Sequence, residues 1–292
     1  MKKLNWDLMK LTKGNREGAY GTQAMRWRDL NLMANQLEQL GFKNLRAKNL
    51  KPRHVEALLR HWREQKLSTG GIKNHMSHLR WWTKKLGISS VIPKDNHTLG
   101  IEDRTYVTNV NKAVVLTAEQ LSQVQDAHIA VSLELQEVFG LRREEAMKLQ
   151  PSYADRADTL VLKPSWTKGG RPREIPIRTE EQRRVLDQAH QLAGKGSMIP
   201  PERSYKTQVG IYERECHRIG LENPHGLRHA YAQTRYEEIT GWKCPVAGGP
   251  RSSELTRNDR ETDREAREQI SKELGHNREQ VTAIYLGRDG LD

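Results

Sequence analysis

Apolar residues recur at three- and four-residue spacing along most of this chain, and this period constrains its fold more than any other feature. In the first third, the pattern predicts helices that carry Leu30–Leu40, Val55–Trp62 and Ile72–Leu86, with Gly41 and Gly87 as helix ends. No run approaches the roughly 18 consecutive apolar residues that a membrane span needs. The chain is therefore expected to be mainly helical and not to span a membrane.

The pattern changes between Thr159 and Ile177. Residues Thr159–Leu162 favour a β-strand, Lys168 and two glycines favour a turn, and Arg173–Ile177 favour a second short strand. The expected fold class is thus mainly α with a small antiparallel β-sheet.

Positive charge is concentrated at the start of the chain. The 292 residues contain 49 Lys and Arg against 37 Asp and Glu, a net charge of +12. Residues 1–100 hold 20 of these basic residues and 7 of the acidic ones, which leaves 29 and 30 for the remainder. A surface with this excess attracts a polyanion by releasing its counterions, so nucleic acid is the expected partner.

Composition also predicts the division into domains. The helical period fades after residue 88, where Pro, Gly and Asn become frequent, and returns at Thr117, which forms a capping-box pattern with Gln120. We predict a basic helical DNA-binding domain over residues 1–100, a linker over 101–115 and a second domain over 116–292.

The cysteines and the N-terminus indicate a cytoplasmic protein. Cys216 and Cys244 cannot form a disulfide framework. The first 18 residues lack the apolar block of about 7–15 residues that a secretory signal requires.

Four separated segments of the second domain carry residues suited to phosphate chemistry. Arg142 follows Gly140, a predicted helix end, and its planar guanidinium can match two phosphate oxygens at once. Lys168 stands at the predicted hairpin tip. His225 and Arg228 are three positions apart, so they share one helix face.

The fourth segment lies near the end of the chain. Gly275 ends a predicted helix and leaves His276 at a turn, and a last helix is expected to begin at Asn277 and to carry Tyr285.

Taken together, these segments resemble the tyrosine recombinase (phage integrase) family. The resemblance rests on GLRREEAMKL, TKGGRPREIPI, PHGLRHAYA and LGHNREQVTAIYL, in this order over about residues 115–286. It implies that residues 116–292 form the catalytic domain and that residues 1–100 form a core-binding domain. In the latter, the matching stretch LSTGGIKNHMSHLR offers Lys73, Asn74, His75 and Arg80 as DNA contacts.

The resemblance also implies a catalytic set and a reaction. Its members are Arg142, Lys168, His225, Arg228, His276 and the nucleophile Tyr285, and Glu145 matches the acidic member of the first motif. The family cuts and rejoins DNA through a 3′-phosphotyrosyl link, without a cofactor. The implied partners are double-stranded DNA and three further copies that form a tetramer on a Holliday junction, with a possible directionality factor. The expected role is integration and excision of a phage or other mobile element, at the nucleoid.

Two features depart from the family pattern. His276 follows His225 by 51 positions (276 − 225), about twice the expected spacing, and residues 241–265 are interpreted as an insertion. Either this insertion contacts DNA or a neighbouring subunit, or it is a tolerated surface excursion. In addition, few residues follow Tyr285, so we expect no long C-terminal tail that docks onto a neighbour.

No metal site is expected. Cys216, His217, His225 and His229 lack the C-x-x-C spacing of a zinc site, and a metal-bound His225 could not act in the H-x-x-R pair.

Two other functions are compatible with the same sequence. The first is DNA relaxation of the type IB topoisomerase kind by the same residues, and the second is a DNA-binding regulator without catalysis. An intact set of six candidate catalytic residues favours an enzyme over the regulator.

Overall fold

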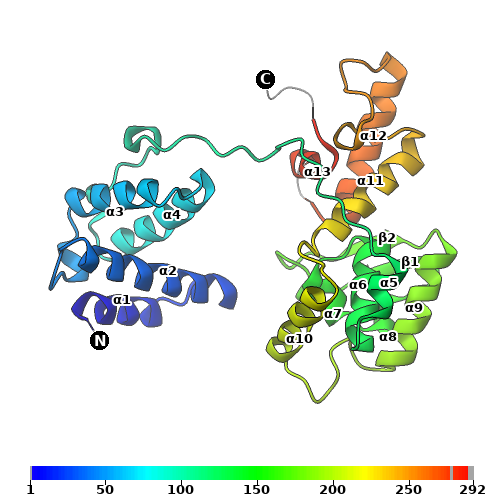
Figure 1. Cartoon of the computed structure of the whole chain (residues 1–292), viewed down its shortest axis with the longest axis horizontal. Coiled ribbons are helices and arrows are strands. Elements are labelled where there is room, and N and C mark those ends of the chain that lie inside the picture. The colour runs from blue at the N-terminus through cyan, green and yellow to red at the C-terminus, as the bar shows by residue number, and fades with distance from the viewer. Residues whose placement is uncertain (1, 277–278, 289–292) are drawn as a thin grey trace. The chain divides into compact units, whose positions relative to one another are not determined.

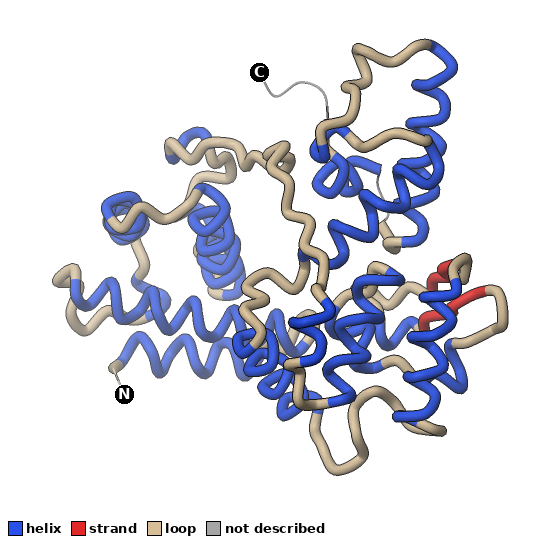
Figure 2. The backbone as a smooth tube through the Cα atoms, turned by 45° about the vertical axis from the view of Figure 1, so that its right-hand side comes forward, coloured by secondary structure: helices blue, strands red, loops and turns tan. Residues whose placement is uncertain are grey.

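The computed structural model describes residues 2–276 and 279–288 and divides the chain into two compact units, Met1–Thr105 and Tyr106–Asp292 (Figure 1). The described residues are mainly helical, with one two-stranded antiparallel sheet, as predicted (Figure 2). None of the helices in these ranges is both long and apolar enough to cross a membrane. Residues 101–116 carry neither helix nor strand.

The N-terminal unit is a helical bundle. Its helices are α1 (Lys3–Gly14), α2 (Tyr20–Gln39), α3 (Pro52–Glu64) and α4 (Thr69–Lys85), with short 3₁₀ turns at Ala47–Asn49, Ser89–Val91 and His97–Leu99. The predicted apolar stripes form its core, in which Trp62 and Trp82 are fully buried. Each indole N–H is satisfied, since Trp62 donates to Gln36 (3.0 Å) and Trp82 to the carbonyl of Ala47 (3.1 Å).

The C-terminal unit contains the sheet and the remaining described helices. These elements are α5 (Ala118–Ser122), α6 (Ala127–Phe139), α7 (Arg143–Lys148), α8 (Pro151–Ala154), β1 (Thr159–Leu162), β2 (Arg173–Pro176), α9 (Glu180–Ala193), α10 (Tyr205–Arg218), α11 (Gly226–Thr240), α12 (Arg257–Glu273) and α13 (Glu279–Leu286), with 3₁₀ turns at Pro164–Trp166 and Pro245–Ala247. The expected first residue of the last helix, Asn277, lies outside the described residues.

Helix α6 is the centre of this unit because apolar residues cover it on two sides. Leu135 and Phe139 join a large cluster that includes residues of the sheet, α9, α11, α12 and α13. Ile129 and Leu133 join a second cluster with residues of α10. The C-terminal end of α6 is thereby held deep between the elements that carry the candidate site.

The strands pair as the sequence pattern predicts. Leu160 lies opposite Ile175, and both are fully buried in the large cluster. The connection between the strands contains Lys168 and two glycines with positive φ, 89° at Gly169 and 66° at Gly170. The hairpin therefore rests on an apolar face and presents an exposed turn.

One feature of the helices differs from the expectation. The apolar pattern from Thr117 to Gly140 predicts an unbroken helix, but Asp126 interrupts it and caps α6 by accepting the N–H of Ile129 (3.1 Å). The region 241–265 contains the 3₁₀ turn at Pro245–Ala247 and the first half of α12, which begins at Arg257.

Gly140 ends α6 in the left-handed conformation, with φ of 59°. A Cβ at this position would lie 2.4 Å from Cδ1 of Tyr231 and 3.1 Å from a methyl group of Leu274. We expect Gly140→Ala to lower the free energy of unfolding by about 2–5 kcal/mol, the sum of left-handed strain and overpacking.

Gly241 provides the matched control. It also ends a helix with positive φ (81°), but nothing lies within 4 Å of the point that a Cβ would occupy, so Gly241→Ala should cost about 1–2 kcal/mol. Urea denaturation of the three proteins measures both values, and equal losses would contradict the close packing around Gly140.

Candidate active site

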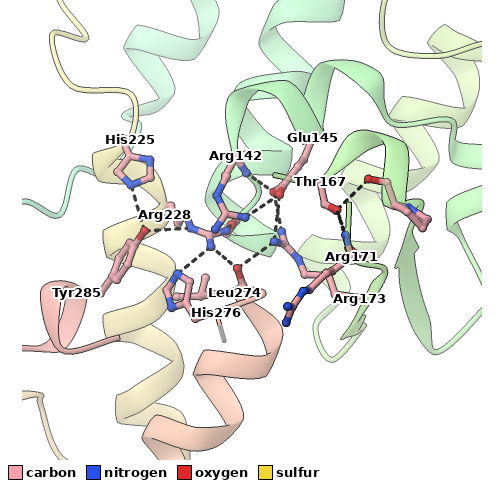
Figure 3. A network of polar contacts seen from close by, with 12 residues as sticks. Arg142, Glu145, Thr167, Arg171, Arg173, His225, Arg228, Leu274, His276 and Tyr285 are labelled. Carbon is pink, nitrogen blue, oxygen red and sulfur yellow. Dashed lines mark hydrogen bonds and ion pairs between the residues drawn. The ribbon is translucent and has the colours of Figure 1, made fainter. Parts of the chain in front are cut away.

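Four segments converge at the end of α6 (Figure 3). Arg142 is the N-cap of α7, two residues beyond Gly140, and His225 is the N-cap of α11, whose first turn carries Arg228. His276 follows the end of α12, and Tyr285 belongs to α13. The structure therefore brings together five of the six candidate catalytic residues, with helix ends setting the position of each.

Arg228 lies at the centre of this cluster. Only 1 % of its surface is exposed, and its guanidinium donates to the main-chain carbonyls of Gly140 and Leu274. Its Nε lies 3.4 Å from the Tyr285 hydroxyl, and its Nη2 lies 3.3 Å from Nε2 of His276. Burial, together with two neighbouring arginines, lowers the pKa of Arg228 to about 10, which leaves it charged at neutral pH.

A buried carboxylate balances the cations. Glu145 accepts the main-chain N–H (2.7 Å) and an Nη (2.8 Å) of Arg142, and it accepts two bonds from Arg173 at 2.7 and 3.1 Å. Burial alone would raise the pKa of the Glu145 carboxyl, but the three guanidinium groups of Arg173, Arg142 and Arg228 hold it below its usual value. Glu145 therefore stays ionised and fixes the direction of both arginines that it binds.

Tyr285 is enclosed by imidazoles. Its hydroxyl lies 3.2 Å from Nε2 of His225, and its ring stacks on that of His276 with centroids 5.3 Å apart. The ring of His229 packs against it at 4.4 Å. The exposed fraction of Tyr285 is 6 %, so its phenol is held inside the pocket of its own chain.

All three histidines are neutral at pH 7. Burial and the cations of Arg228 and Arg142 lower the pKa of His276 to about 3, and burial with the neighbouring His225 lowers that of His229 to about 4. Burial and Arg228 also lower the pKa of His225. A neutral imidazole has one nitrogen free to accept a proton, and here that proton could come from the phenol.

Lys168 stands apart from these contacts but faces the same space. It is exposed, and it lines a cavity of about 460 Å³ together with Arg142 and His276. Arg171 also lines the cavity. Lys163, which follows β1, instead donates to Gln150 (2.6 Å).

Two residues around the site are not singled out for it by sequence reasoning. Arg173, on β2, joins Glu145 to the carbonyl of Leu274 (3.0 Å) and so connects the sheet to the end of α12. The sequence signal for a buried Arg173 is its position two residues before Ile175, which places both side chains on the same face of the strand. His229 enters the sequence reasoning only as a metal ligand.

The predicted DNA contacts on α4 all have partners within their own unit. Those partners are Asp103 for Lys73 (2.9 Å), Arg104 for Asn74 (3.1 Å), Asp29 for His75 (3.3 Å), and Pro93 and Asn96 for Arg80 (3.1 and 2.9 Å). Three of the four are therefore bound by residues of the segment 93–104, and their role toward DNA stays a prediction.

Within residues 2–276 and 279–288, no group of three or more His, Cys, Asp or Glu side chains is arranged to hold a metal ion. The candidate site is instead built from guanidinium, imidazole, ammonium and phenol groups, which suit an anionic substrate.

Two family models match the sequence in tandem. The model described as "Phage integrase, N-terminal" matches residues 1–92, and the model described as "Integrase" matches residues 103–234. The second match includes Arg142, Lys168, His225 and Arg228. No curated protein matches the chain by sequence.

Several solved structures of DNA-recombination proteins share this fold. A lambda integrase dimer bound to a COC′ core site matches 99 % of this chain and 78 % of its own, with 15 % identity and a TM-score of 0.63. XerH bound to its difH substrate matches 98 % and 81 %, with 17 % identity and a TM-score of 0.57. The Tn1549 transposon integrase with circular intermediate DNA matches 100 % and 97 %, with 15 % identity and a TM-score of 0.55.

The neutral histidines make stability depend on pH. In the unfolded chain, His276 has a pKa near 6.5 and becomes protonated as the pH falls below that value. In the folded chain its lowered pKa keeps it neutral, so acid favours unfolding. We expect the free energy of unfolding to fall between pH 7 and pH 5, by up to about 1.4 kcal/mol per pH unit for each such histidine.

Substitution separates this effect from general acid sensitivity. His276→Asn should flatten the slope of unfolding free energy against pH, whereas His217→Asn, at an exposed position of α10, should leave it unchanged. Denaturation at pH 7.5, 6.5 and 5.5 measures both slopes, and an unchanged or steeper slope for His276→Asn would contradict burial of the neutral form.

Proposed function

The chain belongs to the tyrosine recombinase (phage integrase) family of site-specific recombinases, and we propose that it cuts and rejoins DNA through a 3′-phosphotyrosyl intermediate. The observation that carries the proposal is the Tyr285 hydroxyl, which lies within reach of both His225 (3.2 Å) and Arg228 (3.4 Å). A nucleophile, a proton acceptor and an anion-binding group thus meet at one point.

The first task of the site is to hold the scissile phosphate. Arg142 and Arg228 would bind its non-bridging oxygens. His276 would add a hydrogen bond once the phosphate displaces the contact between Nη2 of Arg228 and Nε2 of His276, so that Nε2 carries the ring proton. Charge builds on these oxygens as phosphorus becomes pentavalent, and fixed cations at this position stabilise it. Glu145 and Arg173 act through Arg142, by holding its side chain in place.

The second task is to activate the phenol. A tyrosine has a pKa near 10, so it is a poor nucleophile until its proton is removed. His225, kept neutral by burial, would accept this proton, and the guanidinium of Arg228 would stabilise the phenolate.

The third task is to release the 5′ oxygen. This oxygen is a poor leaving group as an alkoxide because it is a strong base. Lys168, on the exposed turn that borders the cavity, would protonate it. The phosphotyrosyl bond conserves the energy of the broken bond, so attack by a 5′ hydroxyl of another strand rejoins DNA without ATP or metal.

The substrate would be double-stranded DNA, held mainly by the basic N-terminal unit through phosphate contacts. We infer a tetramer that passes through a Holliday junction, supported by the similar fold of a lambda integrase tetramer solved on such a junction (15 % identity, TM-score 0.59). We also propose that the protein integrates and excises a phage or other mobile element at the nucleoid, together with a directionality factor. The match to a phage integrase family model supports the integration step of this proposal.

A suicide substrate tests the proposal. Nicked duplexes taken from the DNA that flanks the gene should give a detergent-resistant covalent complex with the wild-type protein, because the freed strand end diffuses away. Tyr285→Phe should abolish the complex entirely. Tyr231→Phe is the matched control, since its hydroxyl binds Glu273 (2.7 Å), and it should retain the complex.

The outcomes also separate the rival functions. A complex that survives in Tyr285→Phe would place the nucleophile elsewhere, and DNA retention without any complex would favour a regulator. Efficient relaxation of a supercoiled plasmid that lacks the site would favour a topoisomerase.

The acid role of Lys168 makes its own prediction. Lys168→Ala should slow cleavage by a factor of about 10²–10⁴, the usual contribution of a general acid. A substrate with a 5′-phosphorothiolate should restore the rate, because a thiolate leaves without a proton. The cleavage rate on both substrates is the measurement, and absence of rescue would remove Lys168 from this role.

A further inference from the structure

The segment 109–114, near the start of the C-terminal unit, lies against α11, which follows His225, and against the end of α13, which carries Tyr285 (Figure 1). The main-chain N–H of Val114 donates to the carbonyl of Gly226 (3.1 Å), directly after His225. A Cβ at Gly226 would lie 2.5 Å from a methyl group of Val114 and 2.7 Å from the carbonyl of Lys112. The approach is so close that α11 needs a glycine at its first residue.

Asn109 forms a two-point contact with the residues after α13. Its side-chain amide donates to the carbonyl of Arg288 (3.1 Å) and accepts the main-chain N–H of the same residue (3.1 Å). The side-chain amide thus makes the same pair of hydrogen bonds that the backbone of a neighbouring β-strand would make. Asn109 itself adopts a positive φ of 51°, which asparagine tolerates better than most residues do.

A third contact reaches the backbone of the tyrosine. Gln233, on α11, donates from Nε2 both to Oδ1 of Asn111 (2.9 Å) and to the main-chain carbonyl of Tyr285 (3.3 Å). One amide group of α11 therefore binds both the segment 109–114 and the main chain of Tyr285, the residue that carries the phenol.

Gly287, which follows α13, makes further contacts. Arg267 donates to the carbonyl of Gly287 (2.9 Å), and a Cβ on Gly287 would lie 2.8 Å from the backbone nitrogen of Val246. Val246 belongs to the 3₁₀ turn within the predicted insertion. The C-terminal end of α13 thus lies between the insertion and the segment 109–114.

We propose that Asn109 and Gln233 are positioning residues, which hold the end of α13 so that the Tyr285 hydroxyl meets Arg228 and His225. This inference rests on the proposed function. The phenol projects from an eight-residue helix with few turns of its own to steady it, so contacts at its C-terminal end set where the hydroxyl lies. The segment lies near the start of the C-terminal unit, so its contacts with the end of α13 join two parts of that unit that are far apart in the sequence.

The test compares two asparagines in the full-length protein. Asn109→Gly removes both bonds to Arg288 without backbone strain, because glycine accepts positive φ. Asn44→Gly is the matched control, since Asn44 is also exposed with positive φ (58°) but belongs to the N-terminal unit. At saturating suicide substrate, we expect Asn109→Gly to slow covalent-complex formation about tenfold and Asn44→Gly to stay within twofold of wild type.

An added nucleophile separates positioning from general loosening of the pocket. In a Tyr285→Phe background, hydroperoxide anion can attack the same phosphorus and displace the 5′ oxygen, whose proton comes from the enzyme or water. Strand cleavage by hydroperoxide needs the phosphate pocket but no tyrosine. Adding Asn109→Gly should therefore leave the hydroperoxide-supported rate unchanged.

Two results would overturn the inference while the proposed function stands. One is a wild-type rate of covalent-complex formation for Asn109→Gly, and the other is an equal loss of the hydroperoxide-supported rate. Failure of the wild-type protein to form any covalent complex is a different result, which removes the proposed function together with the inference.

Discussion

The burial of Arg228 is the constraint on which the rest of the site depends. A helix leaves its last carbonyls without partners, and cations are favourable at that end. Arg228 meets this need twice, since it donates to Gly140 at the end of α6 and to Leu274 at the end of α12. The residues that follow these two ends are Arg142 and His276, so one buried guanidinium sets the positions of both.

The free-energy cost of burying charged groups explains why Glu145 and Arg173 lie beside this cluster. Buried charges destabilise a protein unless each finds a partner, and removal of one partner leaves the other uncompensated. Glu145 bonds to two arginines, and Arg173 returns to the carbonyl of Leu274. The sheet, α7 and α12 are thereby joined at the wall of the cavity.

Local chemistry makes much of this predictable. The capping box at Thr117, the glycine after α6 and the period change at the hairpin all have short-range causes, and the structure confirms each one. The break at Asp126 escapes prediction because the apolar period continues across it. The roles of Arg173 and of segment 109–114 depend on contacts with residues far along the chain, which no local pattern encodes. The order of motifs indicates which residues meet, but only the folded chain gives their distances.

The low exposure of Tyr285 has a consequence for the host genome. A phenolate that stood open to solvent could attack any phosphodiester that drifted past, and each such attack would leave a protein-blocked nick. Here the imidazoles of His229 and His276 pack against the ring, and 6 % of the residue's surface is accessible. Under the proposed mechanism, chromosomal DNA that meets this pocket outside a recombination site would find cations to bind but little reactive oxygen.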